Sequence, residues 1–392
     1  MPWSQTTPMD EKTKFIADHL RGVFSITELC LNYRISRKTA YKWIDRYLHE
    51  GPAGLEDRSR KPYLAPNRTP QHITEALLEV RRHHPTWGAG KLLAFVQKRH
   101  RGWELPARST ANEILKREGM LKSKPRRRRI GHPGEPTTRM DSPNDCWCAD
   151  FKGQFRTMDG IYCYPLTITD GNTRFLLACQ GLTSTKVEEA KPIFTRIFKE
   201  YGLPSRIRTD NGVPFATNTL ARLSKLSAWW VRLGVLPELI EPGKPQQNGR
   251  HERMHRTLKA ETTRPPSNTR LAQQRRFDRF REEFNNERPH EALEMHTPAS
   301  LYTSSKRTMP EKLPPLEYPA HYEVRYVSGN GGIRWNCAWV NVSTTCIGEY
   351  VGLEEIDDGI WNVYFGPLKL GRLLEREMCI EDAFGRLKRH QM

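Results

Sequence analysis

The succession of strand and helix patterns between residues 145 and 265 most constrains the fold of this chain. Three apolar segments with strand-like composition come first, and Asp159-Gly160 and Asp170-Gly171 mark the turns between them. The predicted elements follow the order β-β-β-α-β-α-β-α, over residues 145–155, 161–169, 174–181, 184–201, 205–209, 217–233, 235–240 and from 248 onward. This order predicts a mixed sheet with helices packed on it, and hence a central α/β core.

Three carboxylates occupy special places within this pattern. Asp150 lies on the first predicted strand, Asp210 directly follows the strand at 205–209, and Glu252 lies early in the last helix. Fifty-nine residues separate the first pair and forty-one the second. Hard oxygen ligands gathered on one side of a sheet are suited to Mg²⁺. Two such ions about 4 Å apart catalyse in-line attack on a phosphodiester.

Each of these acids also has a purely structural explanation. Asp150 could be a satisfied acid near a strand end, and Asp210 a turn residue before Asn211-Gly212. Glu252 could pair with Arg256 one helical turn further on. The joint occurrence of all three acids, in this order and in these contexts, favours the metal-site interpretation.

The chain is strongly basic, with a formal net charge of +18 and a pI of about 9.6. Residues 1–138 carry 27 Lys or Arg and 14 Asp or Glu, whereas residues 301–392 carry 11 and 12. A generally solubilising surface would spread the charge more evenly. The uneven distribution therefore predicts that the N-terminal third binds a polyanion such as DNA.

Residues 10–50 read as a helix-turn-helix, with helices over 10–21, 26–33 and 36–49. Ser25 begins a capping box and Ser36 is a typical helix cap. Four basic side chains lie off the apolar face of the third helix and are predicted to contact DNA in the major groove: Arg37, Lys38, Lys42 and Arg46. The alternative is a solvated surface helix.

Helical patterns return over residues 69–119 and predict a second helix-turn-helix-like unit or, alternatively, a helical spacer. A basic linker follows, in which four adjacent arginines would bind phosphates without reading sequence: Arg126, Arg127, Arg128 and Arg129. Residues 304–320 hold four prolines and predict another linker. Alternating residues over 321–373, with hairpin signals, predict a small C-terminal β-barrel.

Cysteine usage and hydropathy exclude other classes of protein. The eight cysteines are scattered without a Cys-x-x-Cys pair, which argues against a zinc site and for reduced core thiols. No apolar run is long enough to span a bilayer. We therefore expect a cytoplasmic protein without membrane contact, associated with the nucleoid.

Several motifs resemble the integrase core of bacterial insertion-sequence transposases, over roughly residues 139–303. They are Asp150-Phe151-Lys152-Gly153, Thr209-Asp210-Asn211-Gly212, Asn248-Gly249-x-x-Glu252-Arg253, Arg288-Pro289-His290 and Thr297-Pro298-Ala299. Retroviral integrases are similar more distantly. The forty-one residues between Asp210 and Glu252 exceed the thirty-five usual in that superfamily. An enlarged helix-loop between the two acids would explain the difference.

The resemblance implies an RNase H-like fold and a DDE metal site at Asp150, Asp210 and Glu252, holding two Mg²⁺ or Mn²⁺ ions. It also implies double-stranded DNA partners, namely transposon ends and target DNA, and a homo-oligomer on that DNA. Lys259 would contact DNA near the cleaved end, and Asn211 and Asn248 would shape the DNA-binding site.

The predicted chain is therefore multidomain: helix-turn-helix units, an RNase H-like core and a C-terminal β-barrel. The predicted divisions are 1–60, 66–121, a linker at 122–140, the core at 141–303, a linker at 304–320 and the last domain at 321–392. The predicted function is a DDE polynucleotidyl transferase that cleaves 3′ ends of a transposon and joins them to target DNA. The alternatives are a metal-dependent nuclease on the same fold and a non-catalytic DNA-binding regulator.

Overall fold

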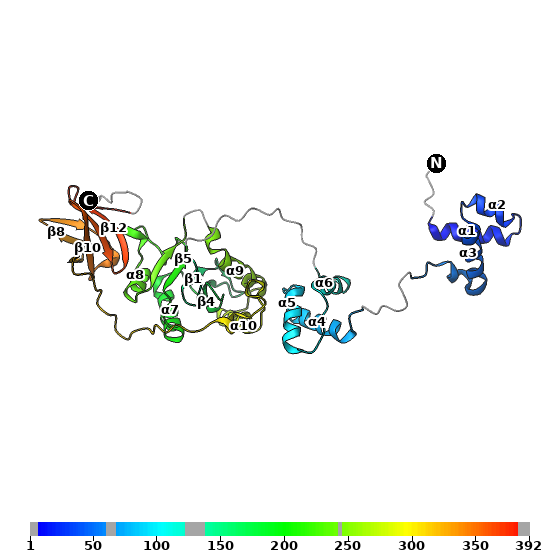
Figure 1. The fold of residues 1–392 in the computed structure, drawn as a ribbon, viewed down its shortest axis with the longest axis horizontal. Helices are drawn as coiled ribbons and strands as arrows, with labels where there is room; N and C mark the ends of the chain where they lie inside the picture. Colours follow the sequence, from blue (N-terminus) through cyan, green and yellow to red (C-terminus); the bar gives the residue numbers. More distant parts are fainter. Residues whose placement is uncertain (1–6, 60–67, 122–137, 242–244, 383–392) are drawn as a thin grey trace. The chain divides into compact units, whose positions relative to one another are not determined.

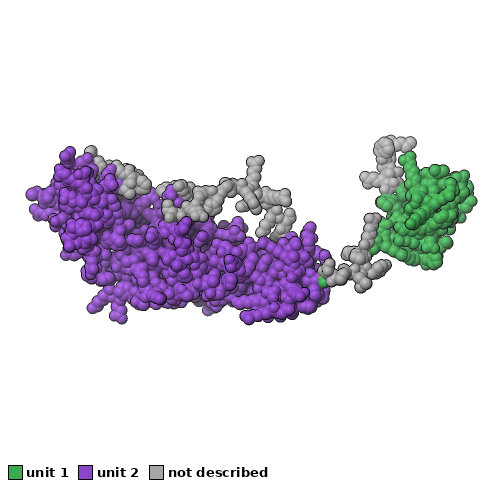
Figure 2. Space-filling model, in the orientation of Figure 1, with its two compact units in different colours: residues 1–68 green, residues 69–392 purple. Residues whose placement is uncertain are grey.

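A computed structural model describes residues 7–59, 68–121, 138–241 and 245–382. The chain divides into two compact units, residues 1–68 and residues 69–392 (Figure 2). In the described residues, no helix is both long and apolar enough to cross a membrane.

The first unit is a bundle of three helices, α1 (Pro8–Leu20), α2 (Ile26–Asn32) and α3 (Arg37–Glu50), followed by the short 3₁₀ helix η1 (Gly51–Leu55). Ser25 and Glu28 form the predicted capping box at the start of α2, and Ser36 caps α3. Ala40, Trp43 and Ile44 form the buried face of α3. The helix-turn-helix prediction is confirmed.

The second unit begins with three further helices, α4 (Gln71–His83), α5 (Ala89–Arg99) and α6 (Arg108–Arg117). They enclose their own apolar core around Trp87, Leu92 and Leu115. This small bundle does not stand apart from the residues that follow, because its polar side chains bind the central core. His84 Nδ1 lies 2.9 Å from Glu283 Oε1, and Thr86 donates a hydrogen bond to Glu261.

The central sheet has the strand order β4-β3-β1-β5-β6, with the short β2 also paired to β3. The strand β3 runs antiparallel to both of its neighbours, β4 and β1, whereas β1, β5 and β6 are parallel to one another. Their bounds are β1 (Cys146–Phe151), β2 (Phe155–Arg156), β3 (Tyr162–Asp170), β4 (Leu176–Leu182), β5 (Arg206–Thr209) and β6 (Leu236–Leu239). The mixed sheet predicted from the sequence is confirmed.

Helices cover both faces of this sheet (Figure 1). On one face, α7 (Val187–Tyr201) and α8 (Lys225–Arg232) pack on Trp147 and Ala149 of β1. On the other face lie α9 (Gly249–Thr262) and α10 (Arg270–Asn286), whose apolar residues pack on Cys163 and Cys179. Because side chains alternate along a strand, Asp150 lies on the opposite face from Ala149, toward α9.

The single helix predicted over residues 217–233 is wrong. The chain forms a short 3₁₀ turn, η2 (Leu220–Arg222), and then breaks before α8. Ala221 and Arg222 have φ angles of 50° and 54°, which cannot continue a right-handed helix, and Ser224 caps a new one. The break turns Leu220 and Leu223 into the apolar core of the C-terminal residues.

The predicted small β-barrel is also corrected. In the described part of the chain, the C-terminal strands form an open antiparallel sheet, β13-β12-β11-β10-β7, and a separate hairpin, β8-β9. Alternation predicts strands but not closure, and here the short hairpin strands pair only with each other. The bounds are β7 (Glu323–Tyr326), β8 (Gly332–Trp335), β9 (Ala338–Asn341), β10 (Tyr350–Asp357), β11 (Ile360–Phe365), β12 (Leu368–Leu374) and β13 (Cys379–Glu381).

The C-terminal sheet is attached to the core through the broken segment between Asp210 and Glu252. Leu220, Leu223 and Val231 share one apolar cluster with residues of the C-terminal strands. Arg232, at the end of α8, pairs with Glu349 and donates a hydrogen bond of 2.8 Å to the carbonyl oxygen of Pro314. The long interval between the second and third acids therefore contains the docking surface for the last domain.

Candidate functional site

Asp150 and Asp210 lie at the same level on neighbouring parallel strands. Cys146 pairs with Arg206 and Cys148 with Arg208, so the two strands keep a constant offset of 60 residues. Continuing this register by two residues places Asp150 beside Asp210, which directly follows β5. A parallel pair brings the carboxyl ends of both strands to one edge of the sheet. The predicted pairing of the first two acids is therefore built into the sheet.

Glu252 lies in the first turn of α9, a helix that contacts β1 and is bound to β3 through His251 and His255. Its side chain is exposed, whereas His251 and His255, which share the neighbouring face of the helix, are buried. The predicted helical position of Glu252 is confirmed.

The carboxylate of Asp150 has a pKa raised from 3.8 to about 7. Burial is the largest cause, because a charged carboxylate loses hydration there; the negative charge of Asp210 comes next and that of Glu252 contributes further. Asp210 and Glu252 both lie close enough to Asp150 to raise its pKa.

The loop after β5 fixes the direction of Asp210. The backbone N–H of Gly212 donates a hydrogen bond of 3.1 Å to Asp210 Oδ1. A Cβ atom at position 212 would lie 3.2 Å from the other carboxylate oxygen, closer than nearly all real Cβ contacts. The glycine of the Asp-Asn-Gly motif therefore leaves room for the acid before it.

The donor set consists of hard oxygens, and the mutual repulsion of three acids favours a bound cation, so these residues fit a divalent metal. Across the described ranges, however, no three His, Cys, Asp or Glu side chains are gathered closely enough to form a ready-made metal site. The metal site stays a prediction.

Four buried polar side chains lie beneath Asp150, and the sequence analysis missed them. We call this set the Thr–His cluster; its members are Thr167 and Thr169 of β3 and His251 and His255 of α9. Thr167 Oγ1 lies 2.7 Å from His251 Nε2 and 2.6 Å from His255 Nε2, and Thr169 Oγ1 lies 2.8 Å from His251 Nδ1. His255 Nδ1 lies 3.6 Å from Asp150 Oδ2. Burial lowers the pKa of His251 to about 3 and that of His255 further.

The sequence did contain a signal for this cluster. The two threonines are two residues apart on one face of a predicted strand, and the two histidines are four residues apart on one face of a predicted helix. The spacing shows that each pair shares a face, but only the packing of α9 on β3 shows that the faces meet.

A buried ion pair supports the strand that leads to Asp210. Arg208 is 2% exposed, and its Nε donates a hydrogen bond of 2.7 Å to Glu238 Oε1 on the neighbouring strand β6. The same guanidinium lies 3.3 Å from the carbonyl oxygens of Gln247 and Thr138. Arg208 therefore holds together β5, β6 and the segment before α9.

The remaining predicted residues of the core differ in what they contact. The side chain of Asn211 donates to the carbonyl of Ile240 at 2.8 Å and accepts from Arg222 at 2.7 Å, so it locks the loop after β5. Asn248 is buried at the start of α9, and its Oδ1 has no hydrogen-bond partner among the described residues. Lys259 is exposed near the end of the same helix.

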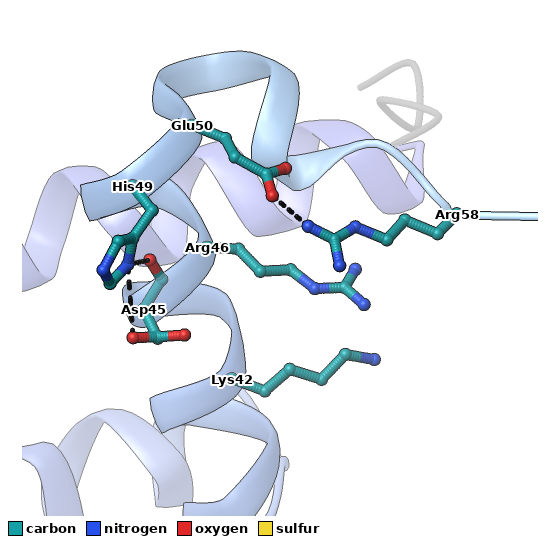
Figure 3. Close-up of a pocket in the computed structure, with 6 residues that line it drawn as sticks. All are labelled: Lys42, Asp45, Arg46, His49, Glu50 and Arg58. Carbon is teal, nitrogen blue, oxygen red and sulfur yellow. Dashed lines mark hydrogen bonds and ion pairs between the residues drawn. The ribbon is translucent and has the colours of Figure 1, made fainter.

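The predicted DNA-contacting residues of the first unit lie on the outer side of α3. Arg37, Lys38 and Lys42 are exposed, and Arg46 is half-buried. A surface hollow is lined by Lys42, Asp45, Arg46, His49, Glu50 and Arg58. Figure 3 shows the charged ends of Lys42, Arg46 and Arg58 along one side of this helix, with Arg58 paired to Glu50.

Trp43 supports two of these cations from beneath. Lys42 Nζ lies 4.6 Å, and the Arg46 guanidinium carbon 5.1 Å, from the centre of its ring. Such cation–π contacts restrict long side chains to one side of the helix. The predicted phosphate-binding residues Arg126, Arg127, Arg128 and Arg129 lie outside the described residues.

Four protein-family models match this chain, two over the core and two over the N-terminal helical region. An integrase core domain family matches residues 141–245, and a second integrase core domain model matches residues 233–298. A helix-turn-helix domain family matches residues 11–63, and a homeodomain-like domain family matches residues 39–115. The first two matches contain all three acids. Together with the observed strand order they support an RNase H-like core of the integrase type.

Two insertion-element proteins are similar to the chain over long stretches. A 31.7 kDa protein of insertion element IS407 from Burkholderia multivorans is 28% identical over 200 residues, which are 50% of this chain and 69% of that protein. A 39.2 kDa protein of insertion element IS476 from Xanthomonas euvesicatoria is 27% identical over 292 residues, covering 72% and 74%. The predicted resemblance to insertion-sequence transposases with an integrase-type core is confirmed.

Among solved structures, the HTLV-2 integrase catalytic core domain in complex with magnesium covers 42% of this chain and 99% of its own. The identity is 14% and the TM-score is 0.34, so the assignment of the core relies on the family matches and the strand order.

Proposed function

We propose that this chain is a DNA transposase that binds transposon ends, cleaves the 3′ ends in a metal-dependent reaction and joins them to target DNA. The observation that carries the proposal is the register of β1 and β5, which sets Asp150 beside Asp210, while the charge of Glu252 on α9 also acts on Asp150. A helix-turn-helix unit with an outward basic face precedes this core in the same chain.

In this proposal Asp150, Asp210 and Glu252 hold two Mg²⁺ or Mn²⁺ ions. Bound divalent cations stabilise the charge that develops on the attacking and leaving oxygens of a phosphodiester. The residues themselves supply the placement: the two aspartates are fixed by the sheet, and Glu252 lies on a helix end that can close over them. Asp150 must give up its proton when a cation binds, because metal ligation requires the carboxylate.

DNA binding is assigned to two separate sets of residues. Arg37 and Lys38 begin α3 and would reach base edges, whereas Lys42 and Arg46 lie further along and would bind phosphates. On the core, Lys259 lies seven residues after Glu252, two turns along the same face of α9, and would contact the DNA end. Arg126 to Arg129 would bind phosphates without sequence preference.

The test is a strand-transfer assay with the full-length protein, Mg²⁺ and DNA that carries the element's ends. Asp210→Asn is expected to abolish the joined product by at least about a hundredfold, because a metal ligand is lost. The same variant should still bind end DNA. Joined product from Asp210→Asn would contradict the triad assignment, and nicked ends that are never joined by the wild-type protein would identify a nuclease instead.

The helix-turn-helix assignment has its own readout. Lys42→Ala with Arg46→Ala should weaken DNA binding and reduce the slope of log affinity against log salt by about 2, because two DNA phosphates are no longer neutralised. Lys98→Ala with Arg99→Ala, at the end of α5, is a matched control of equal charge. An equal loss of slope in the control would show that DNA binding is not specific to α3 and that the second helical bundle contributes equally. Light scattering of the DNA complex would test the proposed homo-oligomer.

A further inference from the structure

The Thr–His cluster has more hydrogen-bonding pairs of atoms than protons, which limits how the protons can be arranged. Thr167 Oγ1 has three neighbours: His251 Nε2 at 2.7 Å, His255 Nε2 at 2.6 Å and the backbone oxygen of Asp150 at 3.2 Å. A hydroxyl donates one hydrogen bond and accepts two. Both rings are buried and their centres are 4.6 Å apart, so both are neutral and each carries one proton.

Three arrangements follow from the choice of acceptor for the Thr167 hydroxyl proton. If that proton goes to the Asp150 backbone oxygen or to His251, then His255 must donate from Nε2. Once Asp150 is ionised, as a metal ligand must be, the bare Nδ1 of His255 would face its carboxylate oxygen at 3.6 Å, with two lone pairs opposed. If the Thr167 proton goes to His255 Nε2, at the shortest of the three distances, the remaining proton of His255 is on Nδ1.

The third arrangement satisfies the whole cluster. His251 then donates from Nε2 to Thr167 and accepts from Thr169 at Nδ1, where the distance is 2.8 Å. Every donor has an acceptor, and each bond points the same way. The two histidines carry their protons on opposite nitrogens.

We propose that the Thr–His cluster is a one-way hydrogen-bond chain that ends with the Nδ1–H of His255 directed at the Asp150 carboxylate. The order along the chain is Thr169, His251, Thr167, His255 and Asp150. The 3.6 Å from His255 Nδ1 to Asp150 Oδ2 is longer than a direct hydrogen bond, and a small rotation of the carboxylate shortens it. His255 is thus a positioning residue: it orients the buried carboxylate through the face that a bound cation does not use.

The hydrogen-bond chain also links two of the three acids. The same two histidines attach α9 to β3, and Glu252 lies between them on that helix. Ligands of a metal ion depend on such outer partners for their orientation, and loss of a partner typically costs 10- to 100-fold in metal affinity. This effect on affinity rests on the proposed function, whereas the proton arrangement does not.

The direct test is the tautomer of each ring. Histidine labelled with ¹⁵N in the full-length protein, in long-range ¹H–¹⁵N spectra, distinguishes a protonated ring nitrogen from a bare one. The expected result is a proton on Nδ1 of His255 and on Nε2 of His251, with signals assigned by the loss of each in His255→Asn and His251→Gln. A bare Nδ1 on His255, both with and without Mg²⁺, would overturn the proposal.

A matched pair of substitutions tests the positioning role. The amide nitrogen of asparagine takes the place of Nδ1 and that of glutamine the place of Nε2. His255→Asn should therefore keep Mn²⁺ affinity within about threefold, whereas His255→Gln should weaken it about 10- to 100-fold. Mn²⁺ alone is the probe, followed by electron paramagnetic resonance, and circular dichroism confirms that both variants fold. Equal losses in the two variants would mean that His255 acts by packing alone.

Thr167→Ser and Thr167→Val extend the same comparison. Serine keeps the hydroxyl and should preserve the wild-type spectrum. Valine removes the acceptor of the His251 Nε2 proton and should move that proton to Nδ1, where Thr169 accepts it, whereas Asp150 still holds the proton of His255 on Nδ1. A proton retained on Nε2 of His251 in the valine variant would refute the hydrogen-bond chain. If the protein shows the predicted tautomers but joins no DNA ends, the hydrogen-bond chain is supported and the proposed function is refuted.

Discussion

Replacing Asp150 with asparagine is expected to stabilise the metal-free core at neutral pH. The pKa of this carboxyl rises from 3.8 in an unfolded chain to about 7 in the folded one, through burial first and the neighbouring acids second. Its side chain is 21% exposed, so water screens it only in part. Three units of pKa at 1.36 kcal/mol each correspond to about 4 kcal/mol of stability.

The direction in which stability changes with pH follows from which state, folded or unfolded, binds the proton more tightly. The folded protein holds it to about pH 7, and the unfolded chain loses it near 3.8. The contribution of Asp150 to stability is therefore fully present below pH 3.8 and is lost as the pH rises to 7. Asparagine has no proton to lose. The free energy of unfolding of the variant should therefore rise relative to that of the wild type by about 1.4 kcal/mol per pH unit between these limits, and the difference should stay constant above them.

The assay is urea unfolding of the full-length protein in a chelator, from pH 4 to pH 8. Hydrogen exchange read by mass spectrometry on peptides from β1 and β3 separates the core from the other domains, which need not unfold with it. Asp141→Asn, at an exposed position, is the matched control and should show no pH-dependent gain. A gap between Asp150→Asn and the wild type that stays constant from pH 4 to pH 8 would refute the reasoning.

Two further predictions concern buried contacts around the site. Arg208→Met removes the partner of Glu238 and should destabilise the core by about 3–5 kcal/mol in urea, because it leaves a charge partly buried and unpaired; the further change Glu238→Leu should restore most of that loss. Arg232→Ala removes the ion pair with Glu349 and should make the segment 304–320 more sensitive to limited proteolysis, whereas unchanged cleavage would show that the apolar contacts alone hold the C-terminal sheet.

Much of the core was predictable because its local patterns agree with its final contacts. Apolar strands with turn signals between them gave the sheet, and the ends of the strands at Asp150 and Asp210 gave the metal-site hypothesis. The parallel pairing of β1 with β5 then needed only the usual chain topology.

Other features depend on partners that are far away in the sequence. Leu220 and Leu223 have helical spacing with α8, yet they pack on strands that begin about a hundred residues later, and the chain breaks to turn them there. Strand alternation over residues 321–373 could not show whether the sheet closes. In the Thr–His cluster, the hydrogen bonds depend on the register between a helix and a strand, which spacing within either element does not contain.

Helix α9 contacts different parts of the second unit near its two ends. Glu252 lies in its first turn, and Glu261, nine residues further on, binds Thr86 of the small helical bundle and Arg288. An α-helix rises 1.5 Å per residue, so roughly 13 Å of stiff rod joins the two positions. The same helix therefore carries the third acid near one end and the contact with the small helical bundle near the other, so the placement of Glu252 depends on the bundle as well as on the sheet.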